Sequence, residues 1–178
     1  IFKWSVLKEA LIKLKDQNEC DFGKHVIPYC FNNNKRIFAY EYNSYWKDVG
    51  TIDSLWEANM DLLDKNNALD LNDPAWKIYT EDPTTPPHYI GPNADIKRSF
   101  ITQGCMIDGE VKNSVLFTSA KIDTGARVID SVLMPGVIVE AGAVVQRTLV
   151  ADGVRIGKNA VVGSPDSEHI ELVAKRVK

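Results

Sequence analysis

A 17-residue repeat in the second half of the chain restricts its possible folds more than any other feature of the sequence. Aliphatic residues recur at this offset, as in Ile122, Val139 and Ile156. The offset also relates apolar, small and hydroxyl residues: Ala126, Ala143 and Ala160; Val128, Val145 and Val162; Ser131 and Thr148; Val132 and Leu149; Gly136 and Gly153; and, one step earlier, Val111, Ser114 and Val115. An α-helix does not superpose its side chains at this spacing, so the segment is a repeat array of another kind.

A period of this length, subdivided into sixes, is typical of a parallel β-helix. Successive coils stack through ladder hydrogen bonds about 4.8 Å apart, so aliphatic side chains superpose inside and small residues fit the corners. The segment from Ile90 to Gly163 provides about four coils, or a rod about 20 Å long. Cys105 lies at the repeat offset from Ile122, so we expect it to pack in the interior and not to act as a nucleophile.

The tail from Glu168 to Lys178 fits two structures. Ile170, Val173 and Val177 suit a short helix, whereas Ile170 and Leu172 suit a strand. The sequence leaves this choice open.

The first 65 residues predict helices and one strand. Apolar spacing predicts a helix over Trp4–Lys15, capped by Ser5, and a second helix from Asp21, a candidate cap, to Phe31. Arg36–Tyr42 has the composition of a strand, and Thr51 suits the start of a third helix. The apolar stripe of that helix comprises Leu55, Trp56, Asn59, Met60, Leu62 and Leu63. This order is typical of part of an α/β domain.

Residues 66–87 carry four of the eight prolines, which predicts a linker with one short strand at Trp76–Tyr79. We therefore expect three regions: an α/β region at 1–65, the linker at 66–87, and the β-helix at 88–178.

Composition excludes several classes of function. The net charge is −3, which argues against a nucleic-acid partner, and no apolar run reaches the ~18–20 residues of a membrane span. Cys20, Cys30 and Cys105 lack CxxC spacing, so neither a disulfide framework nor a zinc site is indicated, and we expect a cytoplasmic protein. The chain opens at Ile1 without Met or a leader, so we expect it to be a fragment.

The richest set of chemical groups lies in the segment Tyr45–Thr51 (YWKDVGT). It combines two aromatic rings, a cation, a carboxylate, a glycine and a helix cap at a strand-to-helix junction, where α/β folds place ligands. The alternative is a solvated turn before a capped helix. Composition alone leaves both open.

The stretch YWKDVGTIDSLWEANMDLL, preceded by DFGKHVIP and followed by WKIYT and by Pro86-Pro87, closely resembles the bacterial ADP-glucose pyrophosphorylases (glucose-1-phosphate adenylyltransferases). The hexapeptide array is what that family carries at its C-terminus, and the resemblance covers nearly the whole chain. It implies a Rossmann-like nucleotidyltransferase domain, here only in part, followed by a left-handed parallel β-helix. The handedness is implied by the resemblance alone.

The resemblance also implies a reaction and its residues. The family makes ADP-glucose and pyrophosphate from ATP and glucose-1-phosphate for glycogen synthesis, with Mg²⁺, as a cytoplasmic, allosteric homotetramer. It implies that Asp48 is a catalytic carboxylate that binds Mg²⁺ and that Asp21, Phe22 and Trp46 line the glucose-1-phosphate pocket. From the residues themselves, Asp21 equally fits a plain helix cap and Phe22 core packing, while Lys47 is expected in solvent.

The sequence also departs from the family pattern. The Gly-rich loop that cradles ATP phosphates, the partner carboxylate for the metal and the Glu-Lys-Pro segment are absent from the 178 residues. We therefore expect that this polypeptide alone is inactive.

Two alternative functions remain from the sequence. A hexapeptide acyltransferase needs a histidine on a coil, but His88 precedes the coils and His169 follows them. A non-catalytic regulatory or oligomerisation module would use the coil faces and edges. Its anion site would draw on Lys121, Arg127, Arg147, Arg155 and Lys158.

Overall fold

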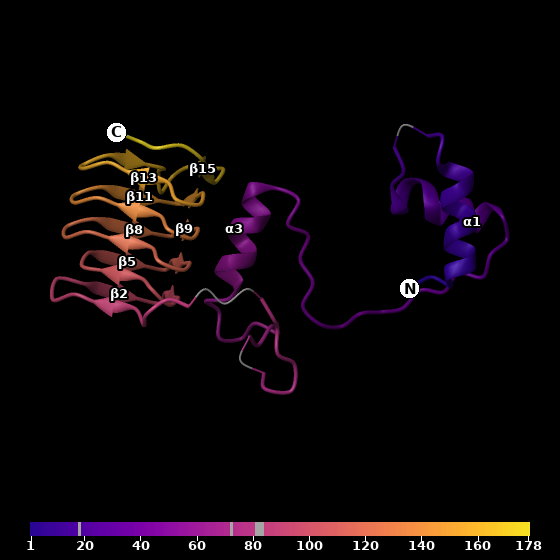
Figure 1. The fold of residues 1–178 in the computed structure, drawn as a ribbon, viewed down its shortest axis with the longest axis horizontal. Helices are drawn as coiled ribbons and strands as arrows, with labels where there is room; N and C mark the ends of the chain where they lie inside the picture. The colour runs from indigo at the N-terminus through magenta and orange to yellow at the C-terminus, as the bar shows by residue number, and fades with distance from the viewer. Residues whose placement is uncertain (18, 72, 81–83) are drawn as a thin grey trace. The chain divides into compact units, whose positions relative to one another are not determined.

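A computed structural model describes residues 1–17, 19–71, 73–80 and 84–178 (Figure 1). The chain forms two compact units, Ile1–Asn43 and Ser44–Lys178, and each is described by itself. This division falls ahead of the region limit expected at residue 65. The third helix therefore belongs to the same compact unit as the β-helix.

The first unit is a small helical cluster. It contains α1 (Trp4–Leu14), the π-helical turn η1 (Phe22–Val26) and α2 (Ile27–Asn32). Its core comprises Ala10, Leu14, Val26 and Cys30. The expectation that Ser5 caps α1 is wrong, because Lys3 is the N-cap and Ser5 lies inside the first turn. Pro28 is tolerated in the first turn of α2, where its missing N–H has no helical partner to lose.

Two predicted strands do not form. The described residues 36–42 and 76–79 pair with no sheet, although both segments are rich in aromatic and β-branched side chains. A strand needs a neighbour for its backbone hydrogen bonds, and composition supplies none. The described structure gives these segments no such neighbour, so they lie as irregular backbone.

The second unit is a parallel β-helix, as the repeat predicts, with coils stacked one on another (Figure 1). Its three five-stranded sheets have the orders β1-β4-β7-β10-β13, β14-β11-β8-β5-β2 and β15-β12-β9-β6-β3, and every pairing is parallel. The strands are β1 (Tyr89–Ile90), β2 (Asp95–Lys97), β3 (Phe100–Ile101), β4 (Met106–Ile107), β5 (Glu110–Lys112), β6 (Val115–Leu116), β7 (Lys121–Ile122), β8 (Arg127–Ile129), β9 (Val132–Leu133), β10 (Ile138–Val139), β11 (Val144–Gln146), β12 (Thr148–Val150), β13 (Arg155–Ile156), β14 (Val161–Val162) and β15 (Glu171–Val173).

The coils are not all 17 residues long. Ile122 pairs with Ile107, at an offset of 15 and not 17, because β4 and β5 are joined by residues 108–109 where β7 and β8 are joined by residues 123–126. The expected register of Cys105 with Ile122 is therefore wrong. Cys105 is nevertheless fully buried in the core, and burial raises the pKa of its thiol, so the expected packing role is confirmed.

One corner of the β-helix is built from a repeated pair of residues. Asp130 and Arg147 are corner residues with positive φ values of 49° and 50°, and each precedes a hydroxyl residue. The backbone N–H of Thr148 donates to Ser131 Oγ at 3.2 Å, and Ser131 N–H donates to Ser114 Oγ at 3.1 Å. All three hydroxyl residues are fully buried, so the ladder satisfies backbone groups that water cannot reach.

Helix α3 (Ile52–Asp61) lies alongside the coils (Figure 1). Thr51 caps it as predicted, in a capping box with Ser54. Its apolar stripe, with Leu55, Trp56 and Met60, packs on the outer residues Val115, Val132, Leu149 and Ile170 of the β3–β6–β9–β12–β15 sheet and its following loop. Those strands are apolar on both faces because the inner face fills the core and α3 covers the outer one.

The tail resolves in favour of a strand. Glu171–Val173 forms β15, which pairs with β12 at an offset of 23 residues (Thr148↔Glu171), so the chain between β14 and β15 makes a longer excursion than in other coils. Val177 then bridges to Ile156. Among the described residues, no helix has both the length and the apolar character needed to cross a membrane.

Candidate functional site

The segment Tyr45–Gly50 leads directly into the N-terminus of α3 and alternates in burial. Tyr45 and Lys47 are half-buried, whereas Trp46 and Asp48 are exposed, and the indole of Trp46 is 74% exposed. Such alternation is the period of extended backbone, with successive side chains on opposite sides. Two of the predicted site residues, Trp46 and Asp48, therefore share the outward side.

The inward side is fixed to the last turn of α3. The Tyr45 hydroxyl donates to Asp61 Oδ2 at 3.1 Å, and Lys47 Nζ lies 3.1 Å from both Asp61 Oδ2 and Glu57 Oε2. Burial raises the pKa of the Tyr45 hydroxyl, and hydrogen bonds to Glu57 and Asp61 raise the pKa of Lys47. The expectation that Lys47 sits in solvent is wrong, because these carboxylates hold it against the helix.

Asp48 is placed to offer a carboxylate. Its Oδ1 accepts a hydrogen bond from Gly50 N–H at 3.2 Å, which turns the chain toward the Thr51 cap. In the described part of the chain, no three Asp, Glu, His or Cys side chains gather as a metal site. A carboxylate oxygen is the ligand that Mg²⁺ prefers, so Asp48 suits the role of one ligand.

Asp21 and Phe22 belong to the first unit. Asp21 Oδ1 accepts the backbone N–H of Lys24 at 2.7 Å, which makes it the N-cap of η1, and this hydrogen bond lowers the pKa of Asp21. The ring of Phe22 packs edge to face on Phe2, with centroids 5.6 Å apart. The local structural roles considered for both residues are therefore present, while their substrate role stays a prediction.

The start of α3 is clamped to the β-helix. Trp56 Nε1 donates to the carbonyl oxygen of Asp130 at 2.8 Å, and the Arg147 guanidinium lies 5.5 Å from the centroid of the Trp56 rings. On the neighbouring turn, Asp53 Oδ1 accepts the backbone N–H of Ile170 at 2.8 Å. The β-helix thus determines where α3 begins, and with it where the Trp46–Asp48 segment ends.

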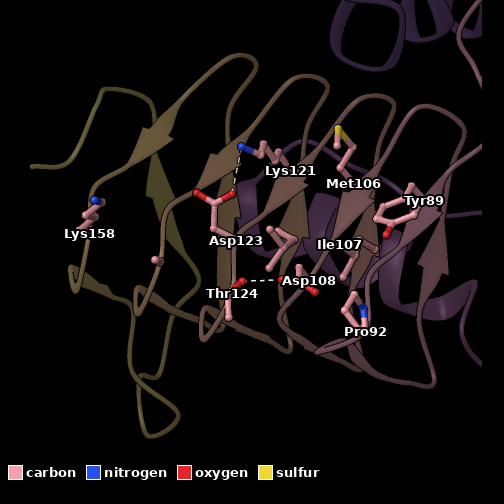
Figure 2. Close-up of a pocket in the computed structure, with 11 residues that line it drawn as sticks. Tyr89, Pro92, Met106, Ile107, Asp108, Lys121, Asp123, Thr124 and Lys158 are labelled. Atoms are coloured by element: carbon pink, nitrogen blue, oxygen red, sulfur yellow. Dashed lines mark hydrogen bonds and ion pairs between the residues drawn. The ribbon is translucent and has the colours of Figure 1, made fainter.

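A separate groove of about 430 Å³ lies on the outer face of the β1–β4–β7–β10–β13 sheet (Figure 2). Its lining includes Tyr89, Met106, Asp108, Lys121 and Asp123. The acids already have partners: Lys121 Nζ lies 3.1 Å from Asp123, and Asp108 accepts hydrogen bonds from Thr124 and Asn93 (Figure 2). The groove contains none of the predicted substrate residues.

The basic residues considered for an anion site are distributed over separate ion pairs and contacts. Arg127 pairs with Glu110 at 2.7 Å, and Arg155 with Glu140 at 2.7 Å. Arg147 Nε donates to the Ser167 carbonyl oxygen at 2.9 Å. These contacts neutralise the cations locally and favour structural roles for them.

Neither histidine proposed for acyl transfer lies on a coil strand. His88 is exposed ahead of β1, and His169 lies in the excursion before β15, 3.6 Å from Asp53. The arrangement of the described histidines thus lacks the coil-mounted base that acyl transfer requires.

Sequence reasoning missed the residues that support the segment. Asp61 and Glu57 follow Lys47 by 14 and 10 positions, and only the path of the segment along α3 brings them together. The available signal was the acidic residues at helical spacing beside the predicted apolar stripe.

Comparison with known proteins agrees with this division of the chain. A nucleotidyl transferase family model matches residues 1–65, and a GlmU-like C-terminal hexapeptide model matches residues 88–173. The chain is 45% identical over 175 residues to a glucose-1-phosphate adenylyltransferase of Acetivibrio thermocellus, a match covering 97% of this chain and 41% of that protein. It is 62% identical over 123 residues to the Lachnospira eligens enzyme of that name, covering 69% of this chain and 29% of the relative.

A third enzyme of that name, from Bacillus cytotoxicus, is 41% identical over 181 residues, covering 99% of this chain and 48% of the relative. The chain thus spans less than half the length of these relatives. The resemblance stated from the sequence motifs is confirmed. Similar over almost all of its residues to proteins of this one name, the chain belongs to the glucose-1-phosphate adenylyltransferase family.

Proposed function

We propose that the chain is part of an enzyme that makes ADP-glucose and pyrophosphate from ATP and glucose-1-phosphate. The observation that carries this proposal is the Tyr45–Gly50 segment, which presents Trp46 and Asp48 on one exposed side at the start of α3. An aromatic ring suits the face of a sugar, and a carboxylate suits sugar hydroxyls or a divalent cation. The curated relatives named for this activity match the chain through this segment.

In this proposal Trp46, Asp21 and Phe22 contribute to the glucose-1-phosphate pocket. Trp46 has the exposed ring that stacking on a sugar requires. Asp21 and Phe22 are exposed beside the η1 turn, so their capping and packing contacts leave surface available to a ligand.

Asp48 would hold Mg²⁺ as one ligand of a set that includes groups beyond this chain. Bound Mg²⁺ neutralises the charge on the reacting phosphates. The role of the chain is to hold the carboxylate in place: Gly50 N–H fixes Asp48 Oδ1, and the Thr51 cap fixes the residues that follow.

The remaining expectations from the resemblance belong to this proposal. The regions are 1–65, 66–87 and 88–178, the whole enzyme is a cytoplasmic homotetramer, and nucleic acids and membranes are not its partners. The net charge of −3 and the local ion pairs of the arginines support the exclusion of nucleic acid.

The proposal is tested in a chimera that carries residues 1–178 in place of the segment they match in the Acetivibrio thermocellus relative. We expect the chimera to form ADP-glucose and pyrophosphate. Asp48→Asn should lower its kcat/KM by roughly 10–100-fold, because the substitution removes the charge that binds the cation. Asp64→Asn, an isosteric change at a turn after α3, is the matched control and should change kcat/KM by less than about twofold.

Equal activity of the Asp48→Asn and Asp64→Asn chimeras would exclude the cation role of Asp48. The isolated 178-residue chain is expected to form no ADP-glucose, because its sequence lacks a Gly-rich phosphate-binding motif.

A further inference from the structure

The Tyr45–Gly50 segment folds back along α3 and is tied to the opposite end of that helix. Asp61 is the last residue of α3, yet it contacts Tyr45 and Lys47, which precede the helix. Lengths explain the match: four extended residues from Lys47 to Thr51 span about 13 Å, and ten helical residues from Thr51 to Asp61 span about 15 Å. The segment and the helix therefore form a closed hairpin.

The hairpin is closed by one carboxylate oxygen. Asp61 Oδ2 accepts both the Tyr45 hydroxyl and Lys47 Nζ, each at 3.1 Å. Glu57 also pairs with Lys47, but its side chain is 54% exposed against 36% for Asp61, so water screens it more. Asp61 is the contact shared by both inward side chains.

Fixing alternate residues fixes the ones between them. With Tyr45 and Lys47 bound to α3, Trp46 and Asp48 can point only to the other side, because extended backbone alternates. A slip of the segment by one residue would exchange the two sets and turn Trp46 and Asp48 toward the helix.

We propose that Asp61 is a positioning residue for Trp46 and Asp48: it binds Tyr45 and Lys47 and so holds the substrate side of the segment outward. Its consequence for catalysis rests on the function proposed above. Asp61 acts through the two inward residues and touches no reacting group.

The holding role is tested first in the 178-residue chain, by hydrogen exchange of the backbone amides of residues 45–50. Asp61→Asn removes the charge that binds Lys47, and exchange should become about fivefold faster. Lys47→Met breaks the same contact from the other side and should do likewise. Asp64→Asn is the matched control and should leave exchange unchanged. Unchanged exchange in both test variants overturns the proposal.

The catalytic consequence is tested in the chimera. Asp61→Asn should raise the KM for glucose-1-phosphate about tenfold, because the ring of Trp46 is no longer held in place. Asp61→Glu, which keeps the charge, should recover most of this loss. A lowered melting temperature with an unchanged KM would show a structural role alone and overturn the positioning role. A parent chimera that forms no ADP-glucose would instead refute the proposed function, while the exchange result still decides whether Asp61 holds the segment.

Discussion

Replacing Trp56 with alanine lowers the free energy of unfolding of the second unit by about 3–4 kcal/mol. Trp56 supplies the largest ring of the α3 stripe that packs on Val132 and Leu149. Its Nε1–H also donates to the Asp130 carbonyl oxygen at 2.8 Å, and its ring lies beneath the Arg147 guanidinium. Alanine removes the packing, the hydrogen bond and the cation–π contact together.

The measurement is thermal unfolding of the 178-residue chain followed by β-sheet circular dichroism. The melting temperature should fall by roughly 10 °C, the shift expected for this loss in a unit of this size. Trp76→Ala is the matched control: its indole is 79% exposed, so the melting temperature should change by less than about 2 °C. Equal shifts for the two variants would contradict the packing of α3 on the β-helix.

Ser131→Ala destabilises the β-helix by about 3 kcal/mol although it deletes a single oxygen atom. Ser131 Oγ accepts the Thr148 backbone N–H at 3.2 Å and donates to the Ile129 carbonyl oxygen at 2.7 Å. The residue is fully buried, so water cannot replace either bond. The substitution leaves two backbone groups unpaired, and each costs about 1–3 kcal/mol.

Urea unfolding of three variants separates this effect from simple loss of volume. Ser131→Thr keeps the hydroxyl, and Thr148 shows that the next coil accommodates threonine at the equivalent corner. It should cost less than about 1.5 kcal/mol. Ser99→Ala removes an exposed hydroxyl at the start of the ladder and should cost less than about 1 kcal/mol. A Ser131→Ala variant as stable as Ser131→Thr would exclude the ladder as a source of stability.

The stacked coils could be predicted because superposition leaves a direct trace in sequence. Val128 and Val145 occupy the same place in successive coils and pair in the structure at the offset found by eye. The exceptions arise in the turns, where length can vary without disturbing the pairing of strands. Gly109 marks the shortened turn before β5, since a Cβ there would lie 2.5 Å from the Ala126 carbonyl oxygen. Asp108-Gly109 in place of the longer turn was the available signal for it.

The candidate site could be predicted only where its cause is local. Thr51 caps α3 through residues three positions away, so the cap is evident in the sequence. The contact from Trp56 to Asp130 joins residues 74 positions apart, and only the packing of α3 on the sheet creates it. The sequence indicated that Trp56 lies on an apolar face, but it carried no signal for the partner of that face.

Strand formation was overestimated for a related reason. Arg36–Tyr42 has strand composition, but the described residues around it offer no paired neighbour, and intrinsic preference alone does not make a sheet. The tail shows the opposite case, since Glu171–Val173 has weak local preference and becomes a strand because β12 offers it an edge.

The chimera of residues 1–178 with the remainder of the Acetivibrio thermocellus relative provides the most direct test of the proposed function. The measurement is the product formed from ATP and glucose-1-phosphate, identified by mass spectrometry. We expect ADP-glucose, with one pyrophosphate released per molecule and a rate that depends on Asp48. A folded chimera that forms no ADP-glucose, but transfers an acetyl group from acetyl-CoA in a reaction that depends on His169, would contradict it.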